Sequence, residues 1–177
     1  MSGRLSTVYW DTCVFIAHLT GEQKGASAIS GMDEWIEKME RGQAIIATSA
    51  LTLAEILESR LTDQKRKTYR ALFQRKHLQL VACDEPIARL ASEIRAYYSR
   101  TSGPDEKTIS VADSIHLATA INNSEVISEF HTFDGSDPAK GEKKRARLLI
   151  PLSGNVAGYQ LRICEPHAEQ LRLVALR

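Results

Sequence analysis

The sequence is poor in cysteine, and its cysteines follow no pattern. Cys13, Cys83 and Cys164 are spread over 177 residues without paired or metal-type spacing. This excludes a disulfide framework and gives no sign of a zinc site. Sparse, unpaired cysteines fit a reducing compartment, so we expect a cytoplasmic protein.

Long hydrophobic runs are also missing. Nowhere do about 18 apolar residues follow one another, the length that a membrane-spanning helix needs. The segment before Asp11 lacks the apolar stretch of a signal peptide. We therefore expect neither secretion nor contact with a membrane.

A charge excess of one sign is lacking as well, because the formal net charge is only +1. A nucleic-acid partner therefore has to be argued from how the charge is distributed. Residues 65–76 and 140–147 are rich in Lys and Arg. Such runs could contact phosphates, but exposed charge is commonly only solubilising, and both interpretations stay open.

What is present is the composition of a folded domain, with 43% hydrophobic and 25% charged residues. A chain of this length suits a single core, which is comfortable up to roughly 250 residues. Short apolar runs alternate with helix-type segments, which predicts an α/β fold with a mainly parallel sheet covered on both faces. Strands are expected at Thr7 to Trp10, Ala44 to Ala47, Leu78 to Val81, Val126 to Thr132 and Tyr159 to Cys164.

Helix-type segments fill the intervals between these runs. The helix from Leu51 places Leu53, Ile56, Leu57 and Leu61 on one apolar stripe, with Glu55 nearly opposite. The other helices are expected at Cys13 to Leu19, Ala26 to Glu40, Asp63 to Lys76, Pro86 to Ser99 and Ser110 to Asn122.

Four acids follow a strand or lie in the first turns of the next helix: Asp11, Glu55, Asp113 and Asp134. In parallel sheets ligands bind beyond the carboxyl ends of the strands, so these acids are expected to converge. Clustered carboxylates raise one another's pKa unless a cation neutralises them. Oxygen ligands suit Mg²⁺, or Mn²⁺. Such an ion could support phosphodiester hydrolysis, with Glu55 or Asp113 accepting the proton.

Each acid also has an ordinary structural explanation. Asp11 could only cap a helix, and Asp134 could be a turn residue. Asp113 and Glu55 each complete a capping box, so spacing alone does not prove a site. A phosphatase with Asp11 as nucleophile is a further alternative. The Asp-x-Asp and glycine-rich phosphate signatures expected of that class are missing after the first strand.

The same segments resemble the PIN-domain nucleases, especially the VapC-type toxins of toxin–antitoxin pairs. VYWDTCVFIAHL is similar to the first family motif and places its acid at Asp11, and TSALTLAEILES places the second acid at Glu55. SVADSIHLATA is the most specific piece and places the third acid at Asp113. HTFDGSD resembles the fourth motif, with Asp134 as the acid. Thr12, Thr132 and Asp137 are auxiliary candidates.

The resemblance implies a three-layer α/β/α domain and a metal-dependent endoribonuclease. Asp11, Asp113 and Asp134 would hold Mg²⁺ or Mn²⁺, and cleavage of RNA would leave a 5′ phosphate and a 3′ hydroxyl. It also implies a homodimer and a cognate antitoxin protein as partners. The alternatives are a non-toxin PIN-domain RNA-processing nuclease and a non-catalytic PIN-fold interaction module, although all four acid positions are filled.

The chain departs from the family pattern after the fourth motif. We expect a single PIN-like domain over residues 1–177, with a basic insertion at about 135–158 and a C-terminal extension at 167–177. The insertion leaves open whether Asp134 or Asp137 is the fourth acid. Its basic residues are candidates for RNA binding, namely Lys140, Lys143, Lys144, Arg145 and Arg147.

Four further residues near these motifs have ordinary interpretations. His116 lies one turn after Asp113 and is expected to be a packed, hydrogen-bonded histidine, with contact to the site as the alternative. Trp10 and Trp35 are expected in the core or at a dimer contact. Cys13 is expected to be a small buried hydrophobe and not a nucleophile.

Overall fold

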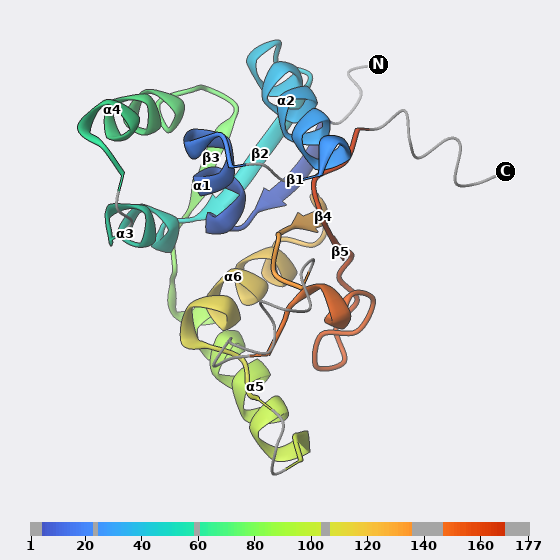
Figure 1. The fold of residues 1–177 in the computed structure, drawn as a ribbon. Coiled ribbons are helices and arrows are strands. Elements are labelled where there is room, and N and C mark those ends of the chain that lie inside the picture. The colour runs from blue at the N-terminus through green and yellow to red at the C-terminus, as the bar shows by residue number, and fades with distance from the viewer. Residues whose placement is uncertain (1–4, 23–24, 59–60, 104–106, 136–146, 169–177) are drawn as a thin grey trace, which may run out of the picture.

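The structure is a computed structural model that describes residues 5–22, 25–58, 61–103, 107–135 and 147–168. In this part of the chain, all strand pairs are parallel and the strands form one sheet in the order β3-β2-β1-β4-β5 (Figure 1). The strands are β1 (Ser6–Trp10), β2 (Ala44–Ser49), β3 (Leu78–Val81), β4 (Ile127–His131) and β5 (Ile163–Cys164).

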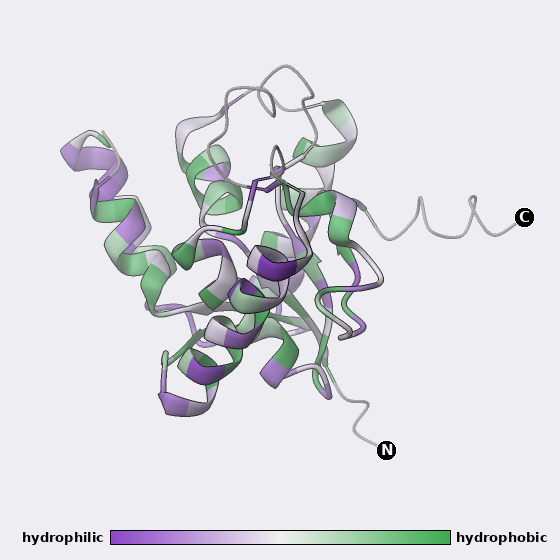
Figure 2. Ribbon diagram, turned by 90° about the horizontal axis from the view of Figure 1, so that it is seen from below, coloured by the Kyte–Doolittle hydropathy of each residue, from purple (hydrophilic) through white to green (hydrophobic). Residues whose placement is uncertain are grey.

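Helices cover both faces of the sheet, which confirms the predicted three-layer α/β/α arrangement. In Figure 2, hydrophobic and hydrophilic residues alternate along these helices, as expected for elements that bury one side only. The helices are α1 (Thr12–Thr20), α2 (Ala26–Glu40), α3 (Leu51–Glu58), α4 (Asp63–Leu72), α5 (Glu85–Thr101) and α6 (Val111–Asn122), with a 3-10 turn, η1, at Ile150–Leu152.

The central strand β1 divides its side chains between two cores. Tyr9 points into the core formed with α5 and α6, while Val8 and Trp10 point into the core formed with α1, α2 and α4. Trp10 and Trp35 are both buried in that second core, at 0% and 3% exposure, as predicted for core residues. Because β1 lies between β2 and β4, the segments that leave these three strands emerge next to one another at one edge of the sheet.

Two element ends differ from the prediction by four residues each, more than the others. The basic helix expected to reach Lys76 ends at Leu72, because the chain turns through Arg75 into β3 and no glycine or proline marks that turn in the sequence. The strand expected from Tyr159 is only Ile163–Cys164. Tyr159 instead pairs with Val156 and closes a tight turn. The two middle residues of this turn have positive φ.

The apolar stripe predicted after Leu51 is only partly buried. Ile56 is fully buried, but Leu57 is 53% exposed and was wrongly placed on the buried face. Leu61 is buried, yet it lies beyond α3, which ends at Glu58. A helix of eight residues makes only about two turns and buries little more than one position of the stripe in each turn. This short length explains why the predicted stripe is only partly buried.

Among the described residues, no helix combines the length and the apolar character that a membrane crossing requires.

Candidate metal centre and active site

The four predicted acids line one pocket of about 450 Å³ at the carboxyl edge of the sheet. Asp11 follows β1, Glu55 lies on α3 after β2, Asp113 lies in the first turn of α6, and Asp134 follows β4. The acids therefore arrive from separate elements, as the parallel topology requires. The pocket is also lined by Thr12, Cys13, Ile16, Glu58 and Phe133.

Asp11 is 7% exposed and is held by hydrogen bonds to both of its carboxylate oxygens. Oδ1 accepts from the backbone N–H of Thr12 at 2.8 Å, which is the helix-capping role considered above. Oδ2 accepts from the hydroxyl of Thr132 at 2.7 Å and from the thiol of Cys13 at 3.2 Å. Asp11 can therefore cap α1 and line the pocket at the same time. The three hydrogen bonds fix its carboxylate in place.

Glu55 is held by a small network beside Asp11. Its Oε2 accepts a hydrogen bond from the Thr12 hydroxyl and lies 2.7 Å from Nε2 of His116. The other ring nitrogen of His116 lies 2.7 Å from the hydroxyl of Tyr9, which also accepts from the backbone N–H of Ser49. His116 is therefore a packed, hydrogen-bonded histidine, as predicted, and it also contacts a pocket acid.

The electrostatics of this network favour a charged pair. Burial would lower the pKa of His116, but the hydrogen bond to Glu55 and the charges of Asp11, Glu55 and Asp113 outweigh it and raise that pKa. Burial would raise the pKa of Glu55, but the hydrogen bonds from His116 and Thr12 outweigh it and lower that pKa. Glu55 therefore enters the pocket as a carboxylate.

The other two acids also combine a structural role with a place in the pocket. The backbone N–H of Asp113 donates to the Ser110 hydroxyl at 3.0 Å, so Ser110 caps α6 and Asp113 sits in its first turn. Asp134 accepts from the backbone N–H of Leu149 at 3.1 Å, and its own N–H donates to the Thr132 hydroxyl at 3.1 Å. The Thr132 hydroxyl thus connects Asp11 to Asp134.

Cys13 is more than the small hydrophobe that the sequence suggested. The residue is half-buried and lines the pocket, and its thiol contacts Asp11 and Thr132 and accepts from the backbone N–H of Phe133 at 3.2 Å. Burial, followed by the charge of Asp11, raises the pKa of the thiol well above its ordinary value. A protonated thiol is a poor nucleophile, so its chemistry agrees with the non-nucleophilic role that we expected.

The chain after Asp134 is only partly described. Asp137, Lys140, Lys143, Lys144 and Arg145 lie outside the described residues. The Arg147 guanidinium donates to the backbone oxygen of Lys107 at 3.2 Å and to the Ser102 hydroxyl at 2.9 Å. It also stacks 5.0 Å from the centre of the Tyr98 ring, so its contacts bind the returning chain to the end of α5.

Sequence reasoning missed three contributors to the pocket. Glu58 adds a carboxylate one turn after Glu55, a spacing visible in the sequence. Tyr9 contacts His116, and Thr52 accepts a hydrogen bond from Thr12, so both support pocket residues from below. Both look like ordinary core or helix residues in the sequence, and only their three-dimensional contacts reveal the role.

Comparison with known proteins gives one family and a set of similar folds. The family model described as PIN domain matches residues 8–136, more than half of the chain. The structure of VapBC2 from Rickettsia felis bound to a DNA fragment from their promoter is similar with a TM-score of 0.57 and 13% identity. That match covers 89% of this chain and 98% of the other.

A second similar structure is DNA-bound VapBC from Salmonella typhimurium, with a TM-score of 0.51 and 15% identity over 90% of this chain and 97% of the other. At such identities the likeness concerns the fold. No curated protein matches the chain.

Proposed function

This chain belongs to the PIN-domain family, and from that premise we propose that it is a metal-dependent endoribonuclease acting at the acidic pocket. The family resemblance seen in the four motifs is thereby confirmed, whereas the reaction is our proposal. One observation carries it: five carboxylates from four separate parts of the fold, two of them on α3, line a single pocket of about 450 Å³. They are Asp11, Glu55, Glu58, Asp113 and Asp134.

The donor set fits a hard divalent ion. PIN domains typically bind a divalent metal, and Mg²⁺ or Mn²⁺ is bound by carboxylate oxygens together with water. In the described part of the chain, Asp11 and Glu55 pair with His116 but form no ion pair with Lys or Arg. Packing these carboxylates together is unfavourable unless further positive charge offsets their repulsion. We assign the ion to Asp11, Asp113 and Asp134.

When bound, such an ion lowers the pKa of a coordinated water, orients the phosphate and offsets negative charge. The residues of the chain supply the geometry. Thr132 and Thr12 fix the Asp11 carboxylate, and His116 fixes Glu55. An ionised carboxylate on the Glu55 or Asp113 side accepts the proton of the attacking water. Hydrolysis then leaves a 5′ phosphate and a 3′ hydroxyl.

The direct test uses the full-length chain with Mg²⁺ or Mn²⁺ and a single-stranded RNA carrying a fluorophore and a quencher. Asp11→Asn and Asp113→Asn should each reduce cleavage by at least about 100-fold, because each removes a charged ligand. Asp33→Asn, at an exposed position of α2, is the matched control and should keep full activity. Circular dichroism should show that all three variants are folded.

Full activity in either site variant would remove the metal-site proposal. Activity that survives exhaustive chelation would remove the metal dependence, and an inactive wild-type chain in both metals would favour the non-catalytic interaction module.

Within this class we propose the toxin role, with a cognate antitoxin that covers the pocket. It is supported by the resemblance to VapC-type toxins and by folds similar to those of the two VapBC complexes. Induced expression should arrest the growth of a bacterial host, and Asp11→Asn should abolish that arrest. Growth that continues despite active enzyme would instead indicate an RNA-processing nuclease. We also propose a cytoplasmic homodimer, which light scattering of the purified protein tests.

A further inference from the structure

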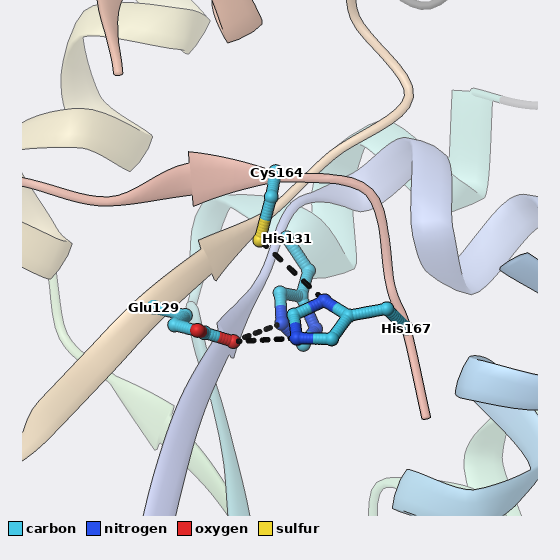
Figure 3. A group of neighbouring side chains, drawn as sticks. All are labelled: Glu129, His131, Cys164 and His167. Carbon is cyan, nitrogen blue, oxygen red and sulfur yellow. Dashed lines mark hydrogen bonds and ion pairs between the residues drawn. The ribbon is translucent and has the colours of Figure 1, made fainter. Parts of the chain in front are cut away.

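A second group of metal-ligating side chains lies outside the acidic pocket and shares no residue with it. Glu129 and His131 come from β4, Cys164 from β5 and His167 from the segment that follows β5 (Figure 3). One ligand atom from each residue lies within 4.8 Å of the ligand atoms of the other three. The proposed nuclease chemistry does not use this group.

The sheet itself brings these residues together. In the parallel register His131 is the partner of Trp10 on one side and of Cys164 on the other. Side chains at paired positions point to the same face of a sheet, so His131 and Cys164 both face the side covered by α2. Glu129 lies two residues before His131 and therefore shares that face.

The distances are close to those around a tetrahedral ion. Oε2 of Glu129 lies 3.1 Å from Nε2 of His131 and 3.8 Å from Nε2 of His167, and Sγ of Cys164 lies 3.8 Å from Nδ1 of His167. With zinc–ligand bonds of 2.0–2.3 Å, neighbouring ligand atoms of a tetrahedron are about 3.3–3.6 Å apart. The two contacts of His167 come from different ring nitrogens, so its side chain, which is 19% exposed, would turn to present one of them, and the four ligand atoms, now within 4.8 Å of one another, would draw closer around the ion.

Burial makes the carboxylate of Glu129 depend on positive partners. Glu129 is 1% exposed and His131 is fully buried, and a buried charge is unfavourable unless it is paired. Arg162 donates from Nε to Oε1 of Glu129 at 3.1 Å, while Oε2 faces the two histidines. An outer cation that orients a ligating carboxylate through its second oxygen is a common companion of metal ligands.

The surroundings fix the ligands in place. A Cβ at Gly31 of α2 would lie 2.5 Å from the backbone N and Cα of His167, so the helix packs directly on the backbone of the segment that carries this ligand. The Trp35 ring meets the His131 ring edge-on, with their centres 5.7 Å apart. The two histidines therefore sit on a preformed frame, which lowers the cost of ordering a metal site.

We propose that Glu129, His131, Cys164 and His167 form a structural zinc site that clamps β5 to β4. A thiolate and two imidazoles select Zn²⁺ over Mg²⁺ or Mn²⁺, and four protein ligands close the coordination shell as in structural sites. The clamp has a clear purpose, because β5 pairs with β4 at only two positions. Zinc bound across this pair replaces the backbone hydrogen bonds that a longer edge strand would provide.

The test measures zinc on the full-length chain after removal of any histidine tag. Purified protein should retain a single zinc ion per chain by mass spectrometry of the metal, and a competing chelator gives its affinity. Cys164→Ser and His167→Ala should weaken zinc binding by more than the roughly 100-fold that loss of an outer partner costs. Cys83→Ser, at an exposed free cysteine, and Asp113→Asn, in the acidic pocket, should bind zinc like the wild type.

A spectroscopic measurement keeps the proposal testable even if a ligand variant fails to fold. Co²⁺ bound to the wild-type chain should show the thiolate charge-transfer band of a cysteine ligand and the visible bands of tetrahedral coordination. Arg162→Met, at a side chain 54% exposed, should weaken zinc binding by about 10- to 100-fold without unfolding the protein.

Zinc binding that Cys164→Ser and His167→Ala leave unchanged would overturn the proposal. So would a Co²⁺ complex without the thiolate band, which would identify Glu129, Arg162 and the histidines as an internal ion-pair network only. These results are independent of the nuclease assay, because they do not involve RNA or Mg²⁺.

Discussion

Thr132 offers the sharpest test of how the acidic pocket is held together. Its buried hydroxyl donates to Oδ2 of Asp11 at 2.7 Å and accepts from the backbone N–H of Asp134 at 3.1 Å. Thr132→Val removes that hydroxyl and keeps the shape of the side chain. Asp11 then loses one donor, and the Asp134 N–H loses its acceptor.

The expected cost follows from these two bonds. A hydrogen bond to a charged group contributes about 1.5–3 kcal/mol, and an unmet buried N–H costs about 1–3 kcal/mol, toward the lower end here because Asp134 is only half-buried. We expect a loss in the free energy of unfolding of roughly 3 kcal/mol. At about 2–4 °C per kcal/mol for a chain of this size, Tm should fall by roughly 6–12 °C. RNA cleavage should fall by about 10- to 100-fold, as for loss of a group that orients a metal ligand.

Thermal unfolding followed by circular dichroism and the RNA cleavage assay measure both effects. Thr132→Ser keeps the hydroxyl and should retain cleavage within a few-fold of the wild type. Thr119→Val is the matched control, because the buried Thr119 hydroxyl donates to the Ile115 oxygen within α6 and contacts Tyr9, not a pocket acid. The reasoning is refuted if Thr132→Val cleaves RNA at the wild-type rate and has the same Tm as Thr119→Val.

Two further predictions concern packing and metal binding. Gly31→Ala adds a Cβ 2.5 Å from backbone atoms of His167, so the overpacking cost of about 1–3 kcal/mol should outweigh the helix-propensity gain of about 1 kcal/mol. Tm should therefore fall, whereas Ser30→Ala at the exposed neighbouring position should raise it slightly, and a stabilised Gly31→Ala would contradict the close packing. Mg²⁺ at 100 times its Kd should stabilise the wild type by about 2.7 kcal/mol. Asp113→Asn should lack this Tm increase, and an equal increase in both would place the ion elsewhere.

The acids could be predicted because their position depends on topology. An acid that directly follows a strand of a parallel sheet has to lie at its carboxyl edge, whatever the details of packing. All four acids were placed by their position after a strand or in the first turns of the next helix, and the motif resemblance pointed to the same four residues. In the order β3-β2-β1-β4-β5, the strands that precede Asp11, Glu55 and Asp134 lie beside one another.

What escaped prediction depends on side-chain contacts between distant segments. The network of Thr12, His116 and Tyr9 spans more than 100 residues of sequence, and no spacing rule connects them. The zinc-type group was missed because only the spacing between cysteines was considered. Its ligands are of three types and come from two short motifs far apart in the sequence, Glu129-x-His131 and Cys164-x-x-His167. The short extent of β5 was missed because a two-residue turn of positive φ at positions 157–158 carries a non-glycine residue.

The two sites meet at the carboxyl end of β4. The backbone oxygen of His131 accepts from the N–H of Asp11 at 3.0 Å, and the N–H of Thr132 donates to the backbone oxygen of Cys164 at 3.0 Å. A zinc ion bound to His131 and Cys164 would therefore fix the residue that precedes Thr132 and the residue whose backbone oxygen bonds the Thr132 N–H. Because Thr132 holds Asp11 and Asp134, the clamp would stiffen the acidic pocket without contributing a ligand to it. Loss of zinc should then loosen the pocket acids in the same way as loss of the Thr132 hydroxyl, though less severely, since the hydroxyl itself remains.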